Sequence, residues 1–123
     1  MDKVFVSWSG GKDCCLALYR AKKSGMDIRH LANMVTADGK RSCSHGINAF
    51  VIKKQAEALG INIAQKPTTD KNYEEVFTQT LREFKKDGVT GGVFGDIDFN
   101  AHREWIERVC GNAGIKPYLP LWL

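Results

Sequence analysis

The 123-residue chain has few cysteines and prolines and no long apolar run. Its four cysteines, Cys14, Cys15, Cys43 and Cys110, show no C-x-x-C spacing and are too sparse for a disulfide scaffold. No apolar run approaches the roughly 18 residues that a membrane span needs, and no signal peptide precedes Val4. We therefore expect reduced thiols, a cytoplasmic location and no membrane partner.

A strong excess of one charge is also missing. The net charge is +4, from 18 basic and 14 acidic residues, and the two kinds alternate along most of the chain. This mild excess suits a polyanionic ligand but gives no clear sign of a nucleic-acid partner. A hydrophobic fraction of 43% and a charged fraction of 26% are ordinary for a soluble protein. The length predicts one small domain with a single core.

The most informative segment is the glycine loop, Ser9-Gly10-Gly11-Lys12-Asp13-Cys14. It lies between a short apolar run, 4–6, and a helical pattern that begins at about Asp13. A strand that turns through two glycines into a helix leaves several backbone amides unpaired, and the helix dipole adds roughly half a positive charge there. Lys12 adds a full positive charge. The segment therefore predicts a phosphate-binding loop.

The spacing excludes two common kinds of phosphate loop. A Walker A loop needs a glycine five residues before its Gly-Lys pair and Ser or Thr after the lysine. Val6 and Asp13 stand at those positions. No G-x-G-x-x-G run of the dinucleotide-binding kind follows the first strand either.

The rest of the chain repeats a simple order, in which a helical pattern ends at a glycine and an apolar strand follows. Glycines 25, 60, 88 and 114 suit the left-handed position at a helix end. The predicted strands after the first are 28–36, 61–65, 89–95 and 118–121. This alternation predicts an α/β fold, a Rossmann-like, doubly wound, parallel five-stranded sheet with strand order 3-2-1-4-5. Ligands bind such sheets at the carboxyl ends of the strands.

Polar segments gather at that predicted edge. The glycine loop follows the first strand, a long loop over 37–46 follows the second, and Pro67-Thr68-Thr69-Asp70 follows the third. The fourth strand leads into Gly95-Asp96-Ile97-Asp98, with His102 and Arg103 close behind. Simpler interpretations stay open, because Asp13 also fits a first-turn acid and Asp96 a capping residue.

The glycine loop resembles the SGGKDS signature of the PP-loop, or N-type, ATP pyrophosphatases, whose fold is that of the adenine nucleotide alpha hydrolases. Further stretches resemble one branch of that superfamily, the diphthine–ammonia ligase family. They are SHGINA at 44–49, QAEALGI at 55–61, GDI at 95–97, 103–110, GIKP at 114–117 and PLW at 120–122. The similarity covers nearly the whole chain in the same order.

The resemblance implies an AMP-forming reaction with ATP and Mg²⁺. Diphthine, a modified histidine of translation elongation factor 2, is activated as an acyl-adenylate, and ammonia then displaces AMP to give diphthamide. The resemblance implies that the catalytic residues are Lys12, Asp13, Asp96 and Arg103, and that Asp13 and Asp96 bind a magnesium ion. It implies that the nucleotide is bound by Ser7, Ser9, Gly10, Gly11, Lys12, Asp13, Cys14, Asn33, Met34, Val35, His45 and Gly95. Residues 33–36 are expected to meet the adenine through backbone groups.

Two departures from the family qualify these expectations. Cys14 replaces the usual serine, and a thiol is a weak hydrogen-bond donor. The family also continues for about as many residues again, so we expect residues 1–123 to be a single ATP-binding domain without the C-terminal substrate domain. Ligase activity is then expected of a full-length protein and not of this chain alone. A non-catalytic nucleotide-binding module and a PP-loop RNA-modifying enzyme stay open as alternatives, as does a homo-oligomer through the C-terminal strand.

Overall fold

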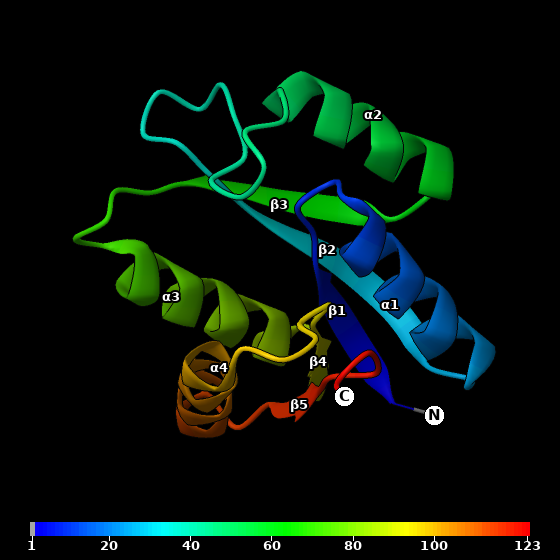
Figure 1. The fold of residues 1–123 in the computed structure, drawn as a ribbon. Helices are drawn as coiled ribbons and strands as arrows, with labels where there is room; N and C mark the ends of the chain where they lie inside the picture. The colour runs from blue at the N-terminus through cyan, green and yellow to red at the C-terminus, as the bar shows by residue number, and fades with distance from the viewer. Residues whose placement is uncertain (1) are drawn as a thin grey trace.

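The computed structural model describes residues 2–123 and contains a five-stranded parallel sheet with helices on both faces (Figure 1). The strands are β1 (Lys3–Ser7), β2 (Asp27–Val35), β3 (Asn62–Pro67), β4 (Gly91–Val93) and β5 (Lys116–Tyr118). The helices are α1 (Lys12–Lys23), α2 (Ala49–Leu59), α3 (Tyr73–Lys86) and α4 (Asn100–Asn112). Within the described residues, no helix is long and apolar enough to cross a membrane.

The strand order is β3-β2-β1-β4-β5, which confirms the predicted α/β topology. Strand β1 lies in the middle and pairs in parallel with β2 and with β4. The chain therefore moves outward from β1 to β3, crosses back, and continues from β4 to β5. The order reverses between β1 and β4, where open parallel sheets leave a crevice for ligands.

The helix boundaries follow the signals expected from the sequence. Gly25, Gly60, Gly88 and Gly114 all have φ between 70° and 92°, the left-handed conformation that glycine adopts without a steric penalty. Helix α3 has Glu74 in its first turn and Lys85 in its last, so both charges are favourable to the helix dipole.

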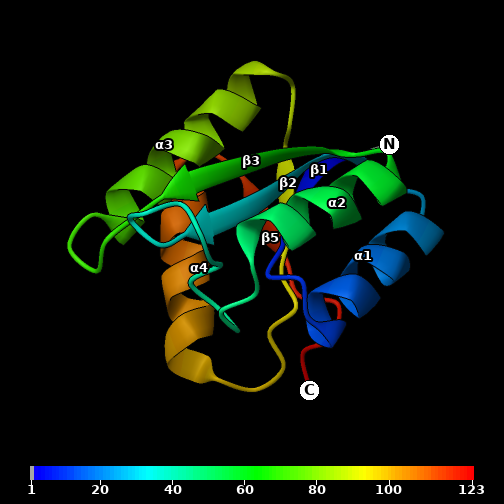
Figure 2. The same ribbon diagram turned by 90° about the horizontal axis from the view of Figure 1, so that it is seen from above.

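Two apolar layers form the core, one on each face of the sheet. Helices α1 and α2 cover one face and α3 and α4 the other (Figures 1 and 2). Because side chains alternate along a strand, β1 contributes to both layers. Val4 and Val6 pack under α1 and α2, whereas Phe5 packs under α3 and α4, and all three are fully buried.

Glycines in and after β4 allow close packing. A Cβ on Gly92 would lie 2.5 Å from the ring of Phe5. A Cβ on Gly95 would lie 2.9 Å from the backbone carbonyl carbon of Asp13. Strand β4 therefore passes directly against the Phe5 ring, and the segment after it rests on the start of α1.

The C-terminal segment departs from the expected strand over 118–121. Strand β5 begins two residues earlier and ends three residues earlier, and a turn follows in which the amide of Trp122 donates to the carbonyl of Leu119. Leu121 is buried in the layer under α1, and the amide of Leu123 donates to the carbonyl of Ile97. The segment thus packs on the chain itself, and homo-oligomer formation through it stays a prediction.

Candidate functional site

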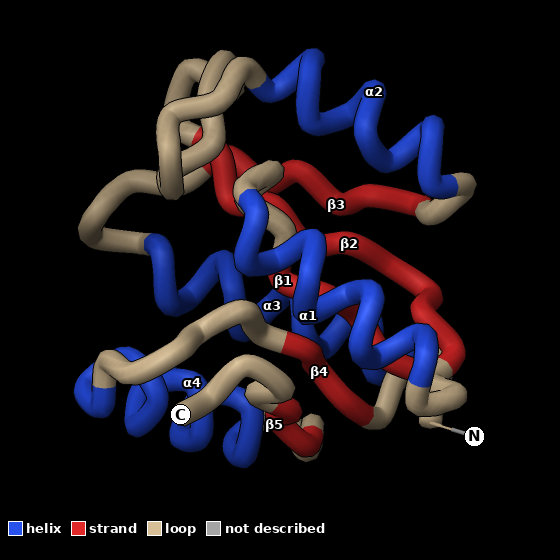
Figure 3. The backbone as a smooth tube through the Cα atoms, turned by 45° about the vertical axis from the view of Figure 1, so that its right-hand side comes forward, coloured by secondary structure: helices blue, strands red, loops and turns tan. Residues whose placement is uncertain are grey.

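A pocket of about 390 Å³ opens at the carboxyl ends of β1, β2 and β4, within the usual size range of small-molecule sites. The loops after β2 and β4 leave the sheet at this edge, away from the N-terminus (Figure 3). The residues that line the pocket come from these strands and the segments that follow them, and from α1, α3 and α4. They are Ser7, Trp8, Ser9, Asp13, Cys14, Ala32, Asn33, Met34, Ser42, Ser44, His45, Tyr73, Phe77, Phe94, Gly95, Asp96, Ile97, Asp98, His102 and Trp105.

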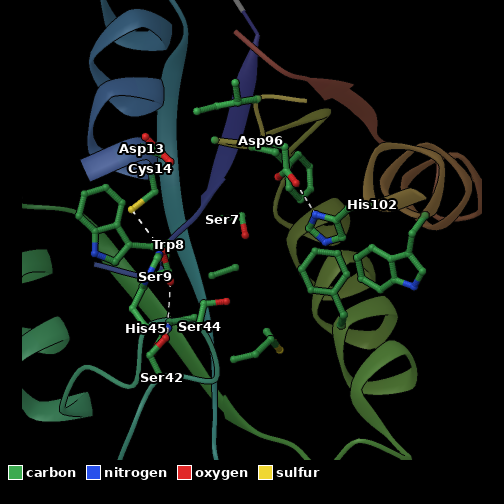
Figure 4. Close-up of a pocket in the computed structure, with 18 of the residues that line it drawn as sticks. Ser7, Trp8, Ser9, Asp13, Cys14, Ser42, Ser44, His45, Asp96 and His102 are labelled. Carbon is green, nitrogen blue, oxygen red and sulfur yellow. Dashed lines mark hydrogen bonds and ion pairs between the residues drawn. The ribbon is translucent and has the colours of Figure 1, made fainter. Parts of the chain in front are cut away.

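The pocket has two chemically different sides (Figure 4). Ser9, Asp13, Cys14 and His45 lie on the side of the glycine loop, which is polar and built from small side chains. Asp96 and His102 lie on the opposite side, where aromatic rings from α3 and α4 form the wall. We call these the loop side and the aromatic side.

On the loop side, a side chain of α2 holds the glycine turn. Gly10 has φ of +83°, and its carbonyl accepts a hydrogen bond from the side-chain amide of Gln55 at 3.5 Å. The indole Nε1 of Trp8 donates to Oε1 of the same Gln55 at 2.9 Å. Because Trp8 is buried, this network fixes the path of the chain just before the glycines.

Cys14, the residue that replaces the expected serine, points back into the loop. Its Sγ lies 3.2 Å from the carbonyl oxygen of Gly11 and 3.8 Å from Oγ of Ser9. The buried thiol thus contacts groups of the loop itself while still lining the pocket. A thiol at this position is a weaker hydrogen-bond donor than the expected serine hydroxyl would be.

His45, from the long loop after β2, lies directly over the glycine turn. A Cβ on Gly11 would come within 3.1 Å of its Nε2, so a larger residue at this position would require the imidazole to shift by a few tenths of an ångström. His45 has φ of +66°, an uncommon conformation for a residue with a side chain. Such backbone strain is frequent at binding sites, where the surrounding structure holds it.

At the end of β2, Asn33 is a structural residue as well as a lining residue. Its buried amide donates to the carbonyl of Trp8 at 2.9 Å and to Oγ of Ser42 at 3.1 Å, and its Oδ1 accepts from Gln65 at 3.3 Å. These bonds join β2 to the glycine loop, to the loop after β2 and to β3. A buried amide satisfied in this way holds its surroundings in one arrangement.

The aromatic side is a continuous cluster of rings. The centroid of Phe77 lies 5.3 Å from that of Trp105 and 6.3 Å from that of Phe94, and Tyr73 lies 6.0 Å from Trp105. Burial raises the pKa of the Tyr73 hydroxyl, with smaller contributions from Cys43 and Asp96. The tyrosine is therefore neutral at physiological pH.

Asp96 and His102 form an ion pair at the edge of this cluster, through Oδ2 of the carboxylate and Nδ1 of the imidazole. The hydrogen bond that His102 donates to Asp96 raises the pKa of His102 above its ordinary value, although partial burial opposes the shift. The imidazole also stacks on Trp105, with an interplanar angle of 14° and centroids 5.7 Å apart. One carboxylate and one indole therefore fix both the position and the plane of this ring.

A surface network holds Trp105 in turn. Its Nε1 donates to Oε1 of Glu74 at 3.0 Å, and Arg108 binds both oxygens of Glu74, at 2.7 and 3.1 Å. The hydrogen bonds from Arg108, and then from Trp105, lower the pKa of the Glu74 carboxyl. Two donors on α4 thus grip one carboxylate on α3, which fixes the indole that backs His102.

The two sides meet where the segment after β4 crosses the start of α1. Because Gly95 has no side chain, it rests on the backbone of Asp13 and Cys14. The next residue, Asp96, therefore belongs to the same small region as Asp13. Among residues 2–123, no group of three His, Cys, Asp or Glu side chains is arranged to hold a metal ion by itself.

Comparisons with known proteins agree with this architecture. The family model of the diphthamide synthase N-terminal domain matches residues 2–117. The chain belongs to this family, which is one of the PP-loop ATP pyrophosphatases. A comparison with the curated proteins found no match.

Solved structures share the fold of this PP-loop domain. One is described as a predicted subunit of tRNA methyltransferase from Methanocaldococcus jannaschii. The two share 18% sequence identity with a TM-score of 0.59, over 99% of this chain and 69% of the other. At this identity the likeness concerns the fold alone.

Nine of the predicted site residues line the pocket: Ser7, Ser9, Asp13, Cys14, Asn33, Met34, His45, Gly95 and Asp96. Five others do not: Gly10, Gly11, Lys12, Val35 and Arg103. Gly10 and Gly11 form the backbone of the glycine turn. Val35 is buried, and its carbonyl accepts hydrogen bonds from the amide and the hydroxyl of Thr68. This carbonyl is therefore already hydrogen-bonded within the fold.

The two predicted cations lie outside the pocket. Lys12 is highly exposed, and its Nζ pairs with Oδ1 of Asp13 at 2.9 Å. The guanidinium of Arg103 lies over the ring of Trp122, 4.9 Å from its centroid, and its Nε is 3.7 Å from Glu107. The catalytic role expected for Arg103 therefore stays a prediction.

The site also includes residues that the sequence-based set omits: Trp8, Ser42, Ser44, Tyr73, Phe77, Phe94, Asp98, His102 and Trp105. The helical spacing of Tyr73, Phe77 and Trp105 is typical of residues that face a hydrophobic core. Periodicity therefore does not show that these rings also line a pocket. For His102, the signal in the sequence was its place close behind the polar segment that follows the fourth strand.

Proposed function

We propose that this chain is the ATP-binding domain of an AMP-forming amide ligase resembling diphthine–ammonia ligase. In that reaction, ATP, ammonia and the carboxylate of diphthine on elongation factor 2 give diphthamide, AMP and pyrophosphate. Membership of the diphthamide synthase N-terminal domain family supports ATP use. The acceptor and the amide-forming step belong to the proposal.

The observation that carries the proposal is the junction of the glycine loop with a pocket that continues to the carboxylate of Asp96. Backbone amides at the start of α1 suit an anionic phosphate chain. Attack on the α-phosphate places developing charge on the leaving pyrophosphate, and preorganised amides stabilise such charge. The remaining volume, on the aromatic side, can take a second group beside the reacting phosphate.

Lys12 suits phosphate binding although it points to solvent. Its pairing with Asp13 involves side chains that are 88% and 43% exposed. Such surface pairs contribute little free energy, so exchanging Asp13 for a phosphate oxygen is not costly. The ammonium stands on the first residue of α1, beside the amides that would hold the same phosphates.

The residues of the site fit a magnesium ion. Mg²⁺ in nucleotide sites is held by one or two carboxylates together with phosphates and water, not by a full set of protein ligands. The close approach of Gly95 to the backbone of Asp13 places two carboxylates, Asp13 and Asp96, on neighbouring segments. Bound there, the ion would neutralise phosphate charge.

Calorimetric titration with ATP and Mg²⁺ tests the proposal. We expect binding by the wild-type chain and a Kd raised at least about tenfold in Lys12→Ala, which is the size of one charge-assisted hydrogen bond. Lys22→Ala, at the opposite end of the same helix, is the matched control and should bind normally. Absence of binding, or equal affinity in the Lys12 and Lys22 variants, would contradict the proposal.

Product analysis separates the remaining alternatives. AMP and pyrophosphate support the ligase mechanism, whereas release of ADP would contradict it. ATP that stays bound and intact after long incubation would indicate a non-catalytic nucleotide-binding module. For such an assay, the domain is best studied within a full-length ligase, with ammonia and an elongation factor 2 that carries diphthine.

An RNA-modifying PP-loop enzyme is the second candidate. The sequence leaves it open, and the net charge of +4 is compatible with it. A mobility-shift assay with bulk tRNA tests it. A shift that persists at 200 mM salt would support RNA as substrate. Weak non-specific binding is driven by the release of counterions from RNA, and this driving force falls as the salt concentration rises.

A further inference from the structure

The aromatic side of the pocket contains a flat surface that phosphate binding does not explain. It consists of the His102 imidazole stacked on Trp105, and we call these two rings the platform. From the platform we infer a stacking subsite for a planar nitrogen heterocycle. This inference rests on the proposed function, since the heterocycle belongs either to the nucleotide or to the acceptor.

The exposure of His102 shows which face is available. Trp105 covers one face of the imidazole, and Asp96 engages its Nδ1 edge. The side chain is nevertheless 45% exposed and lines the pocket. Trp105 and Asp96 engage one face and the Nδ1 edge of the imidazole, so a third ring placed on the opposite face would extend the stack.

Contacts within the chain hold the platform in place. Asp96 fixes the edge of the imidazole, and Glu74 fixes the indole behind it through the hydrogen bond to Nε1. Arg108 holds Glu74 by two further bonds. Preorganised rings bind a planar ligand with little loss of conformational freedom, which favours affinity.

The chemistry of the platform suits a heterocycle more than an aliphatic group. Histidine and tryptophan stack with bases whatever their hydrogen-bonding pattern, because every base has a π face. Asp96 adds a carboxylate at the edge of the stack, and a ring N–H or an amino group is its natural partner. An aliphatic chain would leave that carboxylate without an additional donor.

Three substitutions at one position test the platform. His102→Phe keeps a ring but loses the bond to Asp96, whereas His102→Gln keeps a donor for Asp96 but loses the ring. His102→Ala loses both. A stacking role predicts that ring-dependent affinity survives in the Phe variant and falls about tenfold or more in the Gln and Ala variants. Tyr19→Ala removes an exposed aromatic outside the pocket and is the control.

Two probes identify the source of the ring. ATP and inorganic tripolyphosphate, each with Mg²⁺, differ in the nucleoside. If adenine occupies the platform, the wild type prefers ATP, the Gln and Ala variants lose this preference, and tripolyphosphate binds all variants equally. If the acceptor supplies the ring, ATP affinity is the same in all variants. The ATP-loaded wild type and Phe variant then bind N-acetylhistidine amide, detected by NMR, and the Gln and Ala variants do not.

Two results would overturn the inference. One is an unchanged affinity of all His102 variants for both ATP and the histidine probe. The other is retention of affinity in the Gln variant with loss in the Phe variant, since this would show that holding Asp96 is what matters. Failure of tripolyphosphate to bind would instead contradict the phosphate site, so the two proposals fail separately.

Discussion

The two sides of the pocket are built by different means. The loop side uses consecutive residues, small side chains and backbone amides, and its central glycines make room for His45 and Gln55. The aromatic side uses large rings from α3, α4 and the segment after β4, which are held by Glu74 and Asp96. The loop side therefore depends on backbone conformation, and the aromatic side depends on packing.

This difference separates stability from binding. Phe77 and Phe94 belong to the buried layer under α3 and α4 and also line the pocket. Ser9 and Asp13, in contrast, are only partly buried. Substitutions on the aromatic side should thus change both the fold and the site, whereas most on the loop side should change the site alone.

The largest expected effect is that of Phe77→Ala. Phe77 is 2% exposed, and truncation of a buried phenylalanine typically costs about 3–5 kcal/mol of the free energy of unfolding. Ser9→Ala on the loop side should stay within about 0.5 kcal/mol of wild type. Urea unfolding measures both. A loss below about 1 kcal/mol for Phe77→Ala would show that the aromatic wall is not part of the core.

Gly95→Ala should come next, and it tests the contact between the two sides. The new Cβ would meet the carbonyl carbon of Asp13 at 2.9 Å and the amide nitrogen of Cys14 at 3.0 Å. Backbone cannot move aside as a flexible side chain can, so we expect a loss of about 1–3 kcal/mol and weaker ATP binding.

Gly111→Ala is the matched control for that substitution. Gly111 lies in α4, and a Cβ there would meet no heavy atom within 4 Å. It should therefore stabilise the protein by up to about 1 kcal/mol, because alanine is the better helix former. Similar effects of both substitutions on ATP binding would contradict a specific contact at Gly95.

A smaller effect should appear in the titration of His102 in metal-free protein. Its pKa is raised by the bond to Asp96, so NMR should place it above the ordinary value of 6.5. The stability that the pair contributes is fully present below pH 6.5 and is lost as the pH rises through the pKa of the folded state. Asp96→Asn should lower this pKa. An unchanged value would show that Asp96 is not its cause.

The smallest effect should come from Glu74→Gln, which weakens the network behind Trp105. The pKa of Glu74 is lowered by Arg108, so its contribution to stability is present above the ordinary value of 4.5 and is lost as the pH falls through the pKa of the folded state. Both partners are exposed, so the change in stability is small. The clearer result is a shift in the NMR signal of the Trp105 indole N–H, and its absence would contradict the hydrogen bond.

Sequence patterns predicted the fold well because its signals are local. The glycines at the helix ends, the apolar strands and the alternation of the two gave the correct strand order. The boundaries of β4 and β5 were less accurate: β4 covers only Gly91–Val93 of the predicted 89–95, and β5 is Lys116–Tyr118, with a turn at Leu119 and Pro120 where the strand was expected to continue. Strand ends depend on pairing with a neighbour, which a single sequence does not contain.

The sequence by itself determined the phosphate loop and the edge of the sheet at which it lies. Two glycines and a lysine between a strand and a helix impose their geometry on consecutive residues. Tertiary structure alone decided that Asp96 would hold His102 and that Trp105 would lie behind it. Glu74 and Trp105 are 31 residues apart, and only the packing of α3 and α4 against the same sheet face brings them together. That packing depends on the shape and volume of many buried side chains at once, and no short stretch of sequence records it.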